Sequence, residues 1–253
     1  YWERVTETAS VTGANPQNLA ITALGGSKST AKGGVEAEVV RFTSLADLKA
    51  APADSLTGKI AFIDERMVRA QDGSGYGYAV AKRGGCAQAA ADLGAVACLI
   101  RSAGTDSHRM PHTGGMTREG ALGALPAAAL AAPDADQLAR LLERGPVNVK
   151  LNIQVKTADS AASGNVIAEV EGSSLKDEIV LIGCHLDSWD LGTGAIDDAA
   201  GCGIVVAAAN LIQQLPGKPK RTIRVVLYGS EEVGLFGGKA YGEAHADQLD
   251  KHV

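Results

Sequence analysis

Three short polar segments in the last third of the chain contain residue types that bind divalent metals. His185 and Asp187 directly follow an apolar run and are two residues apart. Asp197 lies in a glycine-containing loop, and the pair Glu231–Glu232 follows a second apolar run. Imidazole and carboxylate groups suit zinc or a similar divalent ion. Like charges at this density are costly unless a cation neutralises them, so the set predicts a metal-dependent hydrolytic site.

Each segment also has an ordinary structural explanation when it is considered alone. His185 and Asp187 are compatible with a polar strand exit, and the two adjacent aspartates with a helix N-cap at Asp198. Glu231 and Glu232 are compatible with a helix start, where acidic side chains favour the helix dipole. A structural calcium site is a further alternative, although His185 is an unsuitable ligand for calcium. The presence of all three segments favours the metal-dependent enzyme.

The elements around these segments are predicted to place them at one edge of a sheet. Apolar residues at 178–184 and 222–228 predict two strands, and 165–170 predicts a third. Apolar patterns at 198–215 and 235–245 predict helices that follow the first two strands. This order predicts an α/β unit whose central strands are buried on both faces. Ligands of such sheets bind at the carboxyl ends of strands, where the three segments lie.

The three segments together resemble the co-catalytic zinc exopeptidases, which include bacterial leucine aminopeptidases and glutamate carboxypeptidases. The resemblance is closest to the plasma glutamate carboxypeptidase branch. The motifs that carry it are His185-Leu186-Asp187-Ser188-Trp189, Gly194-Ala195-Ile196-Asp197-Asp198 and Glu231-Glu232. The resemblance implies an aminopeptidase or dipeptidase type of exopeptidase that hydrolyses short peptides with metal-activated water.

The resemblance also implies a role for each residue at a site with two zinc ions. His185 would bind one zinc, Glu232 the other, and Asp197 both. Glu231 would be the general base, and Asp187 would orient His185. The peptide bond that follows Asp197 would be cis.

The family requires one more aspartate and one more histidine, and we expect both after Val253. His245 and His252 do not have the expected context for these ligands. The alternative hypothesis follows from this expectation: the fragment acts only as a protein- or peptide-binding module with an incomplete, inactive metal site.

The resemblance covers almost the whole chain and predicts its division. Residues 1–18 are interpreted as a lead-in from the catalytic domain without secondary structure of their own. Residues 19–158 resemble the protease-associated domain that is inserted in this branch. Residues 159–253 are interpreted as the N-terminal half of the catalytic domain. The predicted fold class is α/β: part of a zinc-exopeptidase mixed-sheet α/β sandwich plus an inserted β-rich α+β domain.

Within the proposed inserted domain, short strands alternate with a few helices. A short helix is predicted from Ser44, its N-cap, to Ala50. The glycine-rich stretch Gly73–Gly77 is interpreted as a surface loop. The other predicted strands are at 35–40, 59–64, 96–100, 127–130 and 147–155, and the other predicted helices are at 78–93 and 134–143.

Composition and charge exclude several classes of partner. The net charge of −5 and the absence of a basic stripe argue against a nucleic-acid partner. No stretch is expected to have the roughly 18 apolar residues of a membrane span. The four cysteines form no dense framework, and each is interpreted as a buried small hydrophobe rather than half of a disulfide. The family resemblance implies a secreted or periplasmic location and a possible homodimer.

Overall fold

The chain forms two compact units, which are described separately. A computed structural model describes residues 1–116 and 122–253. Unit 1 comprises Tyr1–Ser160 and unit 2 comprises Ala161–Val253.

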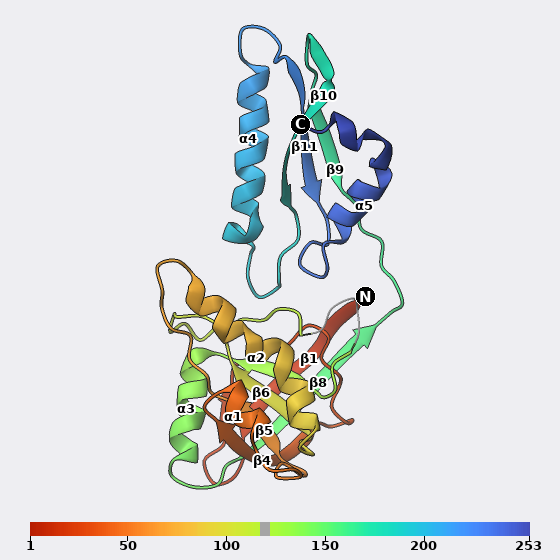
Figure 1. Ribbon diagram of the computed structural model, residues 1–253. Helices are drawn as coiled ribbons and strands as arrows, with labels where there is room; N and C mark the ends of the chain where they lie inside the picture. Colours follow the sequence, from red (N-terminus) through yellow and green to blue (C-terminus); the bar gives the residue numbers. More distant parts are fainter. Residues whose placement is uncertain (117–121) are drawn as a thin grey trace. The chain divides into compact units, whose positions relative to one another are not determined.

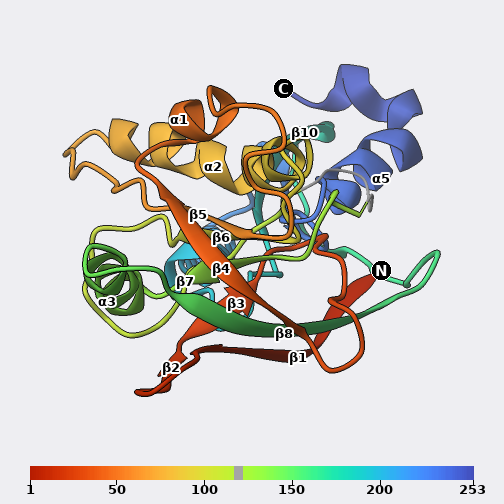
Figure 2. The same ribbon diagram turned by 90° about the horizontal axis from the view of Figure 1, so that it is seen from below.

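Unit 1 is built around an eight-stranded mixed sheet in the order β2-β1-β8-β4-β5-β6-β7-β3 (Figure 2). The central strands β4, β5, β6 and β7 are parallel to one another, whereas β1, β2, β3 and β8 pair antiparallel with their neighbours. The strands are β1 (Trp2–Val11), β2 (Gln17–Leu19), β3 (Ile21–Ala23), β4 (Val35–Phe42), β5 (Ile60–Ile63), β6 (Ala97–Arg101), β7 (Ala127–Leu130) and β8 (Asn148–Thr157).

Alternation along the central strands divides the core of unit 1 into two clusters. Ile60 and Phe62 of β5 belong to one cluster, and Ala61 and Ile63 belong to the other. Successive side chains of a strand point to opposite faces of the sheet, so both faces must be covered. The helices of unit 1 are α1 (Leu45–Lys49), α2 (Ser74–Ala91) and α3 (Ala132–Leu142). Residues of α1 and α2 pack in the second cluster, and residues of α3 pack in the first.

Two predictions for unit 1 are wrong. Residues 1–18 are not without structure, because β1 forms a ten-residue strand that pairs with β8 from Trp2 opposite Thr157 to Val11 opposite Val149. The helix α2 begins at Ser74, inside the stretch that was predicted to be a loop. The cap of α1 is confirmed, since the Ser44 hydroxyl accepts a hydrogen bond from the Asp47 amide at 3.0 Å.

Unit 2 contains a three-stranded sheet in the order β10-β11-β9. The strands are β9 (Val166–Val170), β10 (Leu175–His185) and β11 (Arg221–Tyr228). β10 and β11 are parallel, and β9 is antiparallel to β11. The helix α4 (Gly201–Gln213) lies on one side of this sheet and α5 (Phe236–Ala244) on the other (Figure 1). An irregular turn, η1 (Ala195–Ala200), precedes α4, and a short 3₁₀ helix, η2 (Ala246–Lys251), follows α5.

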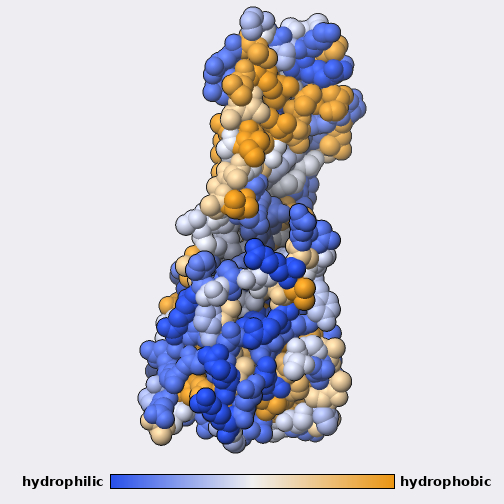
Figure 3. Space-filling model, turned by 90° about the vertical axis from the view of Figure 1, so that its left-hand side faces the viewer, coloured by the Kyte–Doolittle hydropathy of each residue, from blue (hydrophilic) through white to orange (hydrophobic). Residues whose placement is uncertain are grey.

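The apolar surface of unit 2 is only partly covered, which differs from the prediction of strands buried on both faces. In α4 only Ala209 is buried, whereas Ile204 is 69% and Leu211 is 64% exposed. Figure 3 shows hydrophobic residues gathered on this face of unit 2. The stretch Ala195–Gln213, with a mean hydropathy of 1.5, is long and apolar enough to cross a membrane by length and composition alone. The prediction that no stretch has this composition is therefore wrong, although core helices of soluble proteins share it.

Candidate metal centre

The five predicted site residues lie at the end of one strand and in two loops, at one edge of the unit 2 sheet. His185 is the last residue of β10 and pairs in register with Tyr228, the last residue of β11. Because these strands are parallel, their following loops leave the sheet side by side. The first loop carries Asp187 and Asp197, and the second carries Glu231 and Glu232.

His185 faces carboxylates through one ring nitrogen and a carbonyl through the other. Its Nδ1 lies 2.8 Å from the backbone oxygen of Asp187, and its Nε2 lies 2.9 Å from Oδ1 of Asp197. Oε2 of Glu231 lies 3.9 Å from the same Nε2. A carbonyl oxygen can only accept, so Nδ1 carries a proton. Nε2 is then the nitrogen that would bind a metal, once it gives up the proton that it shares with the Asp197 carboxylate.

Asp187 holds the second loop rather than the ring of His185. Its Oδ1 accepts a hydrogen bond from the Glu231 amide at 2.9 Å, and its Oδ2 accepts one from the Glu232 amide at 3.1 Å. The carboxylate lies 3.7 Å from Nδ1 of His185, whereas the Asp187 carbonyl is in hydrogen-bonding contact. In this structure Asp187 thus contacts the ring of His185 through its backbone carbonyl and not through its carboxylate.

The charges at this edge perturb two of the site residues. Burial would lower the pKa of His185, but its hydrogen bonds to Asp187 and Asp197, with the nearby charge of Glu231, raise it overall. Burial raises the pKa of Glu232, and the negative charges of Asp197 and Glu231 raise it further. Crowded carboxylates around one imidazole are therefore electrostatically under-compensated, which favours a cation.

The backbone of both loops departs from common conformations. The peptide bond between Asp197 and Asp198 is cis, as the resemblance implied. Outside glycine, positive φ angles occur among the described residues at Asp54, Leu191, Ser230 and Leu235. Three of these four residues lie in the two loops of the site, and such conformations concentrate where function constrains the backbone.

The donor chemistry fits zinc, but the number of converging donors is small. His185 Nε2 and Asp197 Oδ1 meet directly, and their types match borderline and hard ligands. In residues 1–116 and 122–253, no three His, Cys, Asp or Glu side chains are arranged to hold a metal ion. Among the described residues, only two of the predicted ligands, His185 and Asp197, are therefore in direct contact.

His245 and His252 lie elsewhere in unit 2. Nε2 of His252 lies 2.8 Å from the Tyr241 hydroxyl, and the ring of His245 stacks 4.4 Å from that of Tyr241. His252 forms a bridge with Ile179. The strand from Ile179 to His185 spans roughly 20 Å at about 3.3 Å per residue. Neither histidine is brought to the candidate site, in line with the sequence analysis.

The prediction for Cys184 and Cys202 is wrong, because they form a disulfide with a Cα–Cα distance of 5.2 Å. Cys184 is the next-to-last residue of β10, and Cys202 is the second residue of α4. The disulfide therefore joins the end of β10 to the start of α4. Cys86 and Cys98 of unit 1 are free and buried, as predicted.

Asp198 was considered only as a helix cap, and its second contact was missed. Its Oδ1 accepts a hydrogen bond from the Gly201 amide at 3.2 Å, which is a capping contact for α4. Its Oδ2 accepts one from the amide of His185, also at 3.2 Å. The position of Asp198 next to Asp197 was the only sequence signal for a role near the site. Its hydrogen bond with the amide of His185 in β10 becomes visible only in the fold.

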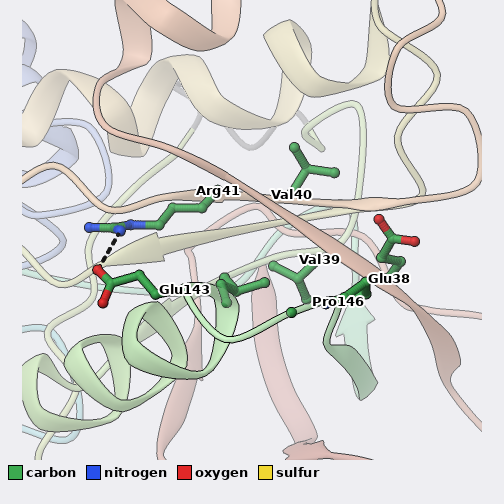
Figure 4. Close-up of a pocket in the computed structure, with 8 residues that line it drawn as sticks. Glu38, Val39, Val40, Arg41, Glu143 and Pro146 are labelled. Atoms are coloured by element: carbon green, nitrogen blue, oxygen red, sulfur yellow. Dashed lines mark hydrogen bonds and ion pairs between the residues drawn. The ribbon is translucent and has the colours of Figure 1, made fainter.

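A separate hollow of about 440 Å³ lies in unit 1 and contains none of the predicted site residues. Figure 4 shows Arg41 and Glu143 paired across it, with Val39 and Pro146 in the wall. Arg41 also forms an ion pair with Asp64, so the positive charge of its guanidinium is already neutralised.

Comparison with known proteins supports the interpretation of the motifs. Residues 165–253 match the model of peptidase family M28. Carboxypeptidase Q from Xenopus laevis is 39% identical, and the match covers 98% of this chain and 52% of that protein. Carboxypeptidase Q from Mus musculus is 36% identical, with 100% of this chain and 52% of that protein covered. The chain thus spans about half the length of these curated relatives.

A solved structure gives the same assignment. The crystal structure of a peptidase M28 precursor from Shewanella amazonensis is similar with a TM-score of 0.93 and 52% identity, over 100% of this chain and 57% of that one. A zinc aminopeptidase from Bacillus subtilis, at 20% identity, shares the fold with a TM-score of 0.67 over 99% of this chain and 55% of that one. The predicted α/β class is confirmed. Through residues 165–253, the chain is similar to the members of peptidase family M28.

Proposed function

We propose that the natural protein containing this chain is a zinc-dependent exopeptidase that hydrolyses short peptides. The observation that supports this most strongly is the meeting of His185 Nε2 with Asp197 at 2.9 Å and Glu231 at 3.9 Å. These groups lie at or just after the carboxyl ends of the parallel strands β10 and β11, where α/β folds bind their ligands. Similarity to a peptidase family supports peptides as the substrate class.

His185, Asp197 and Glu232 would hold the metal, with Asp197 shared between two ions. Bound zinc would supply a water of lowered pKa and polarise the scissile carbonyl. The remaining ligands would come from residues outside this chain, as the family resemblance implies. Peptide hydrolysis is therefore proposed for the complete protein.

Glu231 is the proposed general base and later general acid of the reaction. Its carboxylate lies near the Nε2 edge of His185, and its side chain is 37% exposed, so it is accessible to a bound peptide and to water. Asp187 fixes the backbone of Glu231 and Glu232 through two hydrogen bonds. This arrangement would keep Glu231 at a constant position while it takes a proton from water and passes it to the leaving amine.

Unit 1 is proposed to contain the protease-associated domain, at residues 19–158. Its two core clusters give it a core of its own, which an inserted domain requires. A secreted or periplasmic location is also proposed, because the Cys184–Cys202 disulfide persists best in an oxidising compartment.

The decisive test is Glu231→Gln in the complete natural protein. We expect hydrolysis of a dipeptide to fall by about 10² to 10⁴, because the isosteric amide cannot accept the proton. The zinc content, measured by elemental analysis, should stay unchanged. The matched control is Glu143→Gln, since Glu143 is an exposed unit 1 glutamate paired with Arg41 at 3.5 Å, and it should keep full activity.

The same experiment separates the enzyme from the binding module. A protein that contains no zinc and hydrolyses dipeptides equally well with Glu231→Gln would contradict the enzyme. Peptide binding without hydrolysis would support the module.

A further inference from the structure

The loop that carries most of the candidate metal centre is closed by a covalent bond. Cys184 precedes His185 in β10, and Cys202 lies in the first turn of α4. Their disulfide joins residues 18 apart in sequence. The enclosed segment, residues 185–201, contains His185, Asp187 and Asp197. Any change in this closure is therefore transmitted to three of the five site residues.

The closure lies directly against the backbone of His185. Sγ of Cys202 is 3.1 Å from the carbonyl oxygen of His185. The amide of the same residue donates to Asp198, whose other carboxylate oxygen accepts from Gly201 at the start of α4. The disulfide thus packs against the carbonyl of His185, and Asp198 binds its amide.

Gly201 shows how tightly this arrangement is built. A Cβ at this position would lie 2.1 Å from Oδ1 of Asp198, which is far inside van der Waals contact. The carboxylate therefore occupies the space that any other residue would fill. Asp198 and the disulfide together fix α4 to the end of β10.

We propose that the Cys184–Cys202 disulfide, together with Asp198, positions His185 for metal binding, so that dithiol reductants weaken the site. This inference rests on the proposed function. Two thiols of the reductant become one disulfide, while Cys184 and Cys202 each gain one electron and one proton. Cys202 is partly exposed and Cys184 is buried, so the attack begins at Cys202. The freed loop then loses its closure beside His185.

The chain offers a matched pair of cysteines for comparison. Cys86 and Cys98 are buried and unbonded in unit 1, so their removal changes the number of thiols without changing any disulfide. Their replacement controls for general effects of losing cysteine side chains.

The test is a zinc titration of the complete natural protein in competition with a chromophoric chelator. Oxidised protein is compared with protein that has been reduced by a dithiol and freed of it under anaerobic conditions, and with C184S/C202S. We expect reduction and C184S/C202S to weaken zinc binding by about tenfold or more, the usual effect of losing support around a metal ligand. The absorption spectrum of the cobalt-substituted protein should change in parallel. C86A/C98A should bind zinc as the wild type does and keep its sensitivity to reduction.

The outcomes separate this inference from the proposed function. Oxidised wild type that fails to bind zinc contradicts the proposed function, and the positioning role is lost with it. Zinc affinity and a cobalt spectrum that are equal in oxidised and reduced protein overturn the positioning role alone. If C184S/C202S does not fold, the comparison of zinc affinity between oxidised and reduced wild type tests the inference alone. Global unfolding on reduction, seen by circular dichroism, would make the disulfide a stability element and also overturn the inference.

Discussion

The two units cover their central strands to different extents. Every residue of β5, β6 and β7 in unit 1 is buried. In unit 2, β10 keeps only Ile179 and Cys184 buried, and α4 keeps only Ala209. Unit 1 is therefore stabilised by burial in two core clusters. Unit 2, which holds the candidate metal centre, depends more on a disulfide and on side chains that bind backbone amides.

This contrast predicts a large effect of truncating a large side chain in unit 1 and a small effect in unit 2. Phe62→Ala should lower the unfolding free energy of unit 1 by about 3–5 kcal/mol, since Phe62 is fully buried. Leu211→Ala, at a residue 64% exposed, should change that of unit 2 by at most about 0.5 kcal/mol. Trp2 and Trp189 report on the two units separately when urea unfolding is followed by fluorescence. Equal costs would show that α4 is covered in solution.

Loss of the disulfide should affect only unit 2. C184S/C202S removes a cross-link between residues 18 apart, which should lower the unfolding free energy of unit 2 by about 3 kcal/mol. The transition that Trp2 reports should remain in place, because unit 1 contains no disulfide in its described residues. Coupled shifts of both transitions would contradict the independence of the two units.

The pH dependence of unit 1 should reflect its buried Lys82. Burial lowers the pKa of Lys82 from 10.5 to about 8, although its Nζ donates to the carbonyls of Glu65 and Ala79. Between these two values the unfolded chain binds more protons than the folded one, so stability rises with pH by up to about 3 kcal/mol. Urea unfolding from pH 8 to 10.5 measures this rise. Lys82→Met should abolish it, and an unchanged slope in that variant would assign the rise to other groups.

The smallest expected effect concerns the cap of α1. Ser44→Ala removes the acceptor of the Asp47 amide and should lower the unfolding free energy of unit 1 by about 1 kcal/mol. Ser44→Gly should lower the same free energy by only a few tenths of a kcal/mol, because glycine leaves the amide open to water. A larger cost for glycine than for alanine would indicate that backbone freedom, and not capping, determines the effect.

Local patterns were sufficient where the structure depends on local chemistry. The apolar runs predicted β5, β6 and β7 because these strands are buried on both faces. β1 was missed because most of its residues are only partly buried or exposed, so that no apolar alternation marks it. Its pairing with β8, which is far away in sequence, creates the strand. The start of α2 was missed because the glycines of Gly73–Gly77 weaken any helical pattern.

In the candidate site, too, the local features could be predicted from the sequence and the long-range contacts could not. Residue types and strand ends located all five residues, and the structure brings His185, Asp187, Asp197, Glu231 and Glu232 to one edge of a sheet. The contacts of Asp187 with two amides and the disulfide could not be predicted, because each depends on how a loop returns to its strand. Such returns are set by three-dimensional packing and not by local spacing.

The pairing of β1 with β8 has a consequence for how unit 1 can be moved between proteins. The backbones of Tyr1 and Ala158 exchange two hydrogen bonds, of 3.0 and 3.1 Å. The start of β1 therefore lies beside the end of β8. A segment whose entry and exit points touch can occupy a single surface loop of a host without stretching that loop. Grafting unit 1 onto an unrelated scaffold would therefore allow both of its chain junctions to be designed at a single place on the host.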